Sequence, residues 1–169
     1  MLPDGAAAMF DPLEPGDNSQ RAGLASNDGW EPLPAPTHAK PYFRHLSLGE
    51  PSKVWEYLNA AGEQEGYICR FETVKPDGSP DKEFRPYRYG CLTNEAGRRR
   101  LGWHWKGWLN ERPLYRLPDL LARANAPVIV CEGEKKADAA RQLFAEWEVT
   151  TPMNGATRRT GQLSGGARS

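Results

Sequence analysis

The chain has 169 residues, and its 22 basic and 22 acidic side chains give a formal net charge of zero at pH 7. This length predicts one domain of ordinary size with flexible ends. Three widely spaced cysteines, Cys69, Cys91 and Cys131, form no C-x-x-C pair, which argues against a disulfide framework and a zinc ribbon. No apolar run approaches the length that crosses a membrane, so we expect a cytoplasmic protein without a membrane partner.

Charge is distributed unevenly along the chain. Residues 1–36 carry six acidic side chains and one basic side chain, whereas residues 82–108 carry seven basic side chains and two acidic ones. Counterion release scales with the charges that actually meet phosphates, so a local excess matters more for nucleic-acid affinity than the total. The middle of the chain is therefore where contacts with nucleic acid are expected.

Both ends of the chain are predicted to be disordered tails. Residues 1–41 are rich in Ala, Pro, Gly, Asp and Asn, and apolar residues such as Trp30 follow neither a helical nor a strand period. Residues 157–169 contain no aromatic residue, and Leu163 is the only large apolar side chain among them.

Residues 42–112 predict a small β-rich domain that holds together without zinc. Strand-like runs at 67–74, 83–89 and 101–108 are separated by turn residues, which indicates an antiparallel meander. Pro86 cannot donate a ladder hydrogen bond, so we expect it to confine its strand to an edge. The aromatic residues expected in the core are Tyr67, Phe71 and Phe84.

Residues 113–156 predict a strand, a helix and a second parallel strand, preceded by a short helix at 117–124. The run from Val128 to Cys131 is wholly apolar, which is typical of a strand buried on both faces of a parallel sheet. The helix after it carries a predicted apolar stripe at three- and four-residue steps. That stripe comprises Ala137, Ala140, Leu143 or Phe144, and Trp147. The whole chain is therefore expected to be an α+β or α/β protein.

Glu132 follows the predicted strand directly, at the edge of the sheet where ligands meet such folds. Gly133 removes bulk beside it, and the next helix directs backbone N–H groups and partial positive charge to the same place. A carboxylate at this point can bind a metal or move a proton next to a phosphate. Lys135 and Lys136 either contact that phosphate or only solvate the helix, and both interpretations stay open.

The run from Val130 to Asp138, VCEGEKKAD, resembles the first motif of the Toprim domain of primases, topoisomerases and related nucleases. It is especially similar to primase-like proteins of phages and other mobile elements. Two further pieces, at 82–86 and 103–107, resemble the region that precedes Toprim in those proteins. The resemblance implies that Glu132 assists nucleotidyl transfer on a single-stranded DNA template, with Mg²⁺ as cofactor. A replicative helicase domain or protein is the implied companion.

The expected Toprim-like β-α-β unit is incomplete. The family binds Mg²⁺ through a later Asp-x-Asp pair as well as the glutamate, yet no Asp or Glu follows Glu148. Bacterial primases also place an acidic residue where this chain has Lys136. We therefore expect a truncated or frame-shifted relative with little or no primer synthesis.

Arg98, Arg99 and Arg100 lie close to three tryptophans in the sequence, which suggests a second kind of function. Arginines can hold phosphates while bases stack on indole rings, as in non-catalytic modules that bind single-stranded nucleic acid. The alternative places the arginines on a solvated turn and the tryptophans in the core. A third interpretation is an inert remnant of a disrupted gene.

Overall fold

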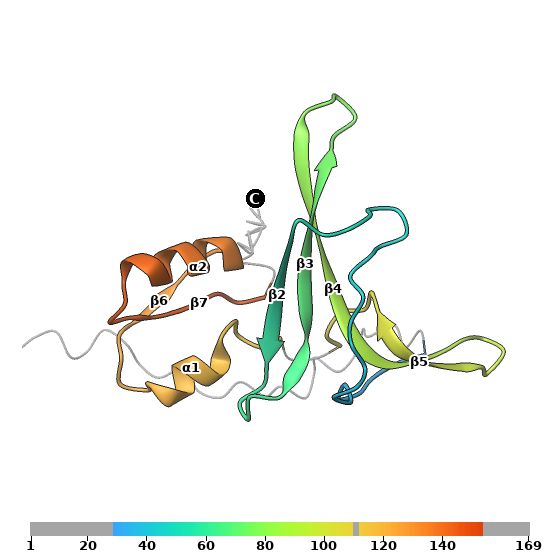
Figure 1. Ribbon diagram of the computed structural model, residues 1–169, viewed down its shortest axis with the longest axis horizontal. Coiled ribbons are helices and arrows are strands. Elements are labelled where there is room, and N and C mark those ends of the chain that lie inside the picture. The colour runs from blue at the N-terminus through green and yellow to red at the C-terminus, as the bar shows by residue number, and fades with distance from the viewer. Residues whose placement is uncertain (1–28, 110–111, 154–169) are drawn as a thin grey trace, which may run out of the picture.

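The computed structural model describes residues 29–109 and 112–153, in which a five-stranded antiparallel sheet packs against a smaller β-α-β unit (Figure 1). The elements in chain order are β1 (Trp30–Pro32), β2 (Lys53–Leu58), β3 (Gln64–Val74), β4 (Pro80–Thr93), β5 (Arg99–His104), α1 (Leu117–Ala122), β6 (Val128–Val130), α2 (Glu134–Leu143) and β7 (Glu148–Thr150). Within the described ranges, no helix is long and apolar enough to cross a membrane.

The predicted antiparallel meander is confirmed, and β4 organises it. The first half of β4 pairs with β3, and its second half pairs with β5 and with β1. Pro86 lies opposite Ile68 of β3, while pairing with β5 begins only at Arg88. Pro86 therefore sits at a local edge, where a missing N–H breaks no ladder.

The prediction of a disordered tail up to residue 41 is wrong for its last part. β1 pairs with β4 in the register Trp30 to Leu92, and only 3% of Trp30 is exposed. Gly90 makes this approach possible, because a Cβ there would lie 2.5 Å from the Trp30 ring. Residues 1–28 and 157–169 lie outside the described residues, so the predictions for them stay predictions.

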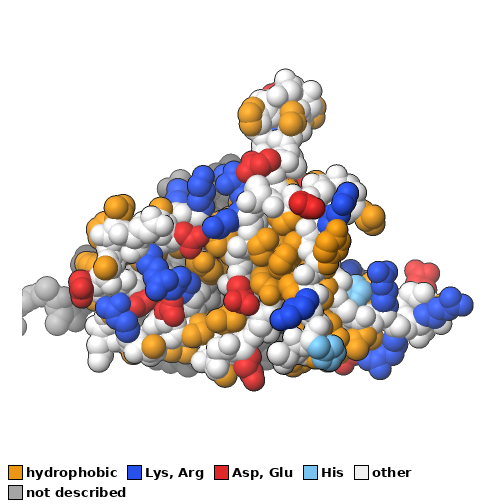
Figure 2. All heavy atoms as spheres, in the orientation of Figure 1, with side chains coloured by type: hydrophobic (Ala, Val, Ile, Leu, Met, Phe, Trp, Pro, Cys, Tyr) orange, Lys and Arg blue, Asp and Glu red, His pale blue; other side chains and the backbone are white. Residues whose placement is uncertain are grey.

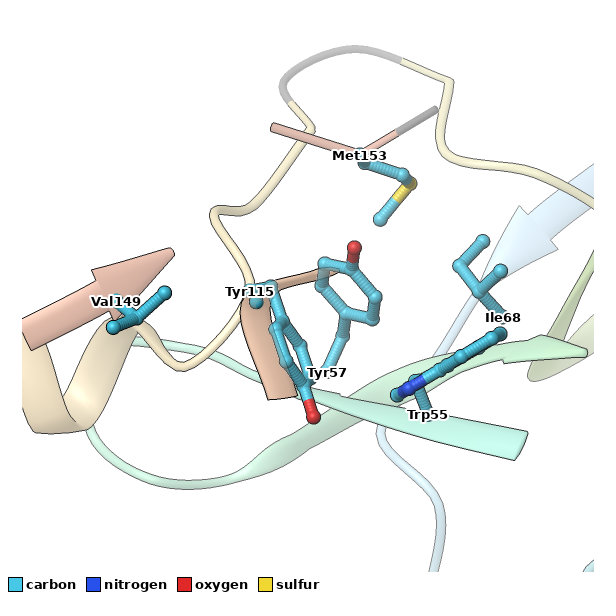
Figure 3. Packing of buried hydrophobic residues seen from close by; sticks show 7 residues of the cluster. Trp55, Tyr57, Ile68, Tyr115, Val149 and Met153 are labelled. Atoms are coloured by element: carbon cyan, nitrogen blue, oxygen red, sulfur yellow. The ribbon is translucent and has the colours of Figure 1, made fainter. Parts of the chain in front are cut away.

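Two hydrophobic clusters lie on opposite faces of the sheet, because side chains alternate along β3. Cys69 and Phe71 face one cluster, which Tyr87 completes together with partly buried residues such as Trp103 and Trp105. The other cluster joins the sheet to the β-α-β unit (Figure 3). Its buried members are Trp55, Tyr57, Ile68, Tyr115, Ala137, Val149 and Met153.

The parallel pairing of β6 with β7 around α2 confirms the predicted β-α-β connection. The burial predicted for β6 is wrong, because Val128 and Val130 are 48% and 67% exposed. On β6 only Ile129 is partly buried, against the cluster that joins this unit to the larger sheet, whereas all three residues of β7 are buried.

The predicted apolar helix stripes are buried only in part. On α2, Ala137 is fully buried, whereas Leu143 is 77% exposed. Phe144 and Trp147, predicted on the same stripe, lie beyond the last residue of the helix, and both are more than 40% exposed. On α1 no residue is buried. The apolar period therefore predicted the positions of these helices correctly. The burial predicted from it was too large, because only part of each helix packs against the rest of the molecule.

Candidate nucleic-acid interface

The turn after β6 and the first turn of α2 face the sheet across a cleft of about 680 Å³. This arrangement brings Glu132 and both predicted lysines together with residues from β2, β3 and β4. The lining residues are Trp55, Ile68, Arg70, Lys82, Glu83, Phe84, Pro86, Glu132, Gly133, Glu134, Lys135 and Lys136.

Strand alternation explains how most of the sheet residues in the lining reach the cleft. Lys82, Phe84 and Pro86 are two residues apart on β4, so they share one face, and Arg70 of β3 stands opposite Phe84. On the other wall, Gly133 precedes α2 in an extended conformation, and a Cβ added there would meet nothing within 4 Å. The space beside Glu132 is therefore open to a ligand.

Glu132 forms an ion pair and a hydrogen bond with Lys136, one turn further along α2. Hydrogen bonding and charge attraction lower the pKa of Glu132 below its ordinary value and raise the pKa of Lys136. The Glu132 side chain is 76% exposed. At neutral pH it is therefore an ionised carboxylate at the mouth of the cleft, without a proton to donate.

Two other acidic residues of α2 fix the helix to the sheet. The buried Glu134 accepts a 2.7 Å hydrogen bond from the Tyr57 hydroxyl, and burial with the neighbouring carboxylate raises the Tyr57 pKa. Asp138 accepts hydrogen bonds of 2.9 Å from the Trp55 indole and the Tyr115 hydroxyl. Asp138 is therefore a structural residue, and the sequence analysis did not predict the role of Glu134.

Four cationic side chains line the cleft: Arg70, Lys82, Lys135 and Lys136. Arg70 pairs with Glu72 at 3.0 Å, yet its buried Nε has no hydrogen-bond partner among the described residues. Within the same residues, neither Lys82 nor Lys135 forms an ion pair, so both remain available to an anion.

The prediction that Phe84 belongs to the core is wrong, because 40% of this residue is exposed and it lines the cleft. Its ring lies over the buried Trp55, with centroids 6.3 Å apart and planes inclined by 25°. Sequence analysis missed Arg70 and misplaced Phe84. The period-two spacing of Phe84 from Lys82 was the available signal for a shared polar face.

Arg98, Arg99 and Arg100 lie elsewhere, on the hairpin that joins β4 to β5, at the opposite end of the molecule from α2 (Figure 1). Arg99 pairs with Glu31 at 3.0 Å and donates from Nε to the Cys91 sulfur at 3.2 Å. All three arginines are exposed. Figure 2 shows basic side chains at the outer end of this hairpin and others over α2.

The tryptophans near these arginines pack mainly inside the molecule. Trp103 stacks on Tyr87 and donates from its indole to the Ala39 carbonyl at 2.8 Å. Trp108 donates to Glu65 at 2.9 Å and lies beneath the Arg88 guanidinium. Base stacking on these rings next to the arginines therefore has little geometric support.

The described residues do not fit a Mg²⁺ site. Mg²⁺ requires near-octahedral oxygen ligands, and no group of three His, Cys, Asp or Glu side chains suited to a metal occurs in residues 29–109 and 112–153. Glu132 forms an ion pair with Lys136, and Glu134 accepts a hydrogen bond from the Tyr57 hydroxyl. A metal would need further acidic ligands beyond these carboxylates.

No protein-family model, curated protein or solved structure matches the chain. The resemblance to Toprim proteins therefore rests on the motif around Glu132 and on the segments 82–86 and 103–107, and it stays a prediction.

Proposed function

We propose that this chain is a Toprim-like module, related to DNA primases, that binds the phosphates of single-stranded nucleic acid in the cleft beside Glu132. The observation that carries the proposal is that basic side chains line the cleft from both of its walls. One wall is the strand-to-helix turn with Lys135 and Lys136, and the other is the sheet face with Arg70 and Lys82.

Each wall offers a different kind of phosphate contact. Among the described residues no side chain caps the start of α2, so its first backbone N–H groups and partial positive charge can meet an anion, while Lys135 adds an ammonium group. Lys82 and Arg70 approach from the sheet. Glu132 would repel a phosphate by itself, but its pairing with Lys136 offsets that charge.

Nucleotidyl transfer is proposed only for a complete relative of this chain. Phosphoryl chemistry uses metal ions to neutralise developing charge and to position oxygens, and the carboxylates described here do not supply such a ligand set. In this chain, binding without primer synthesis is the activity that the geometry supports best.

The proposal predicts that replacing a cleft lysine weakens binding in a salt-dependent way. Fluorescence anisotropy with labelled single-stranded DNA, over a salt series with and without Mg²⁺, measures this effect. For Lys82→Gln and Lys135→Gln we expect weaker binding and a salt slope smaller by about one for each lost phosphate contact.

Lys75→Gln is the matched control, because Lys75 is an exposed lysine of the β3–β4 turn that does not line the cleft. Absence of binding at low salt, with a folded sample, would contradict the proposal. An equal effect of Lys75→Gln would show that binding is not localised to the cleft.

A second candidate is binding by the β4–β5 hairpin, favoured by the exposure of Arg98 and Arg100 at its outer end. Replacing both with Gln would then weaken binding, while Lys82→Gln and Lys135→Gln would leave it unchanged. The same titrations therefore separate the two surfaces.

A further inference from the structure

We infer that Phe84 is a stacking platform for one unpaired base of the strand bound in the cleft, with Trp55 as the layer beneath it. This inference rests on the proposed function and names what the cleft recognises besides phosphate. It assigns a nucleobase position to an aromatic ring on the sheet wall.

The exposure of Phe84 needs an explanation that the core does not provide. Phe71, the residue after Phe84's cross-strand partner Arg70, is completely buried on the opposite face of the sheet, whereas 40% of Phe84 is exposed. A large ring left open inside a cleft has a free apolar surface that water solvates poorly. A flat base is one of the few ligands that covers such a ring and still carries phosphates.

The ring also lies on an aromatic partner that is fixed in place, which supports a stacking platform. Trp55 beneath it is 3% exposed, and its indole N–H donates to Asp138 at 2.9 Å. The two aromatic planes are inclined by 25°. Phe84 therefore presents a supported surface, so a base stacking on it loses little entropy by ordering the protein.

Cations share the cleft with the ring, where they can meet the phosphates of a nucleotide whose base stacks on Phe84. Lys82 is on the same strand face two residues away, and Arg70 is the cross-strand partner of Phe84. Lys135 and Lys136 reach the cleft from the opposite wall. An aromatic surface with basic side chains beside it is the arrangement that binds single strands without reading their sequence.

The test compares two labelled strands of equal length and equal phosphate number, oligo-dT and an oligomer of abasic sites. For the unmodified chain we expect tighter binding of oligo-dT. Phe84→Ala should weaken oligo-dT binding about ten-fold, within the range for loss of one stacked base, and should leave abasic binding unchanged. Phe84→Trp should retain the preference for bases.

Phe144→Ala is the matched control, because Phe144 is 46% exposed and lies outside the cleft. It should leave the binding of both strands unchanged. Circular dichroism of each variant verifies that the fold is retained.

Three results would overturn the inference in distinguishable ways. Equal binding of both strands, unaffected by Phe84→Ala, leaves phosphate binding intact and removes the stacking role. Equal losses for both strands on Phe84→Ala show that the ring supports the cleft without touching bases. No binding of either strand at low salt removes the proposed function itself.

Discussion

Glu132 and Lys136 are a pair of opposite charges at the mouth of the cleft, and this pairing determines what Glu132 can do there. Its carboxylate is held as an ion, so it has no proton to donate, and the described residues around it do not complete the set of ligands that Mg²⁺ requires. The remaining effect of Glu132 on phosphate binding is the repulsion between its negative charge and the phosphate.

We therefore predict that Glu132→Gln strengthens binding of single-stranded DNA at low salt by a few-fold, because it removes a negative charge and frees Lys136. Since the pKa of Glu132 is lowered, the carboxylate stays ionised and the gain should be constant from about pH 6 to pH 8. Anisotropy titrations across this range measure it. Weaker binding, or template-dependent primer synthesis that the substitution abolishes, would show a direct role of the carboxylate.

At the scale of elements, β1 shows how a short strand depends on one residue of its neighbour. Gly90 leaves room for both the Glu31 carbonyl and the Trp30 ring against β4. We predict that Gly90→Ala lowers the free energy of unfolding by roughly 2 kcal/mol, in the range for an overpacked site.

Chemical denaturation measures this loss, with Gly107→Ala as the control. A Cβ at Gly107 would make only an ordinary contact of 3.6 Å with Pro86. Equal stabilities of the two variants would argue against tight packing of Trp30 on β4.

The sequence predicted local elements well and long-range packing less well. The meander and the β-α-β unit have hydrophobic periods that can be recognised within a few residues. The proximity of Glu132, Lys135 and Lys136 follows from their positions directly after β6. Trp30 was misplaced because its partner strand lies some sixty residues away. Phe84 was misplaced because both faces of the sheet carry apolar residues, so alternation cannot tell which face receives α2.

At the scale of the whole molecule, a buried hydrogen bond joins the sheet to α2. Tyr57→Phe leaves Glu134 buried without its donor, so we predict a loss of about 2 kcal/mol in the free energy of unfolding. A double-mutant cycle with Glu134→Gln should give a coupling energy on the order of 1 kcal/mol. Tyr42→Phe, at an exposed tyrosine, is the control, and a coupling near zero would contradict the link.

The polar contacts of α2 also determine how the helix is turned about its own axis. Apolar packing restrains the distance between a helix and a sheet more tightly than the rotation of the helix about its own axis, because dispersion contacts are not directional. Three aromatic donors aimed at two carboxylates one turn apart remove that freedom. The rotation of α2 about its axis, and with it the direction in which Lys135 leaves the helix, is thereby set by the hydrogen bonds of Glu134 and Asp138 on the adjacent face of the same helix.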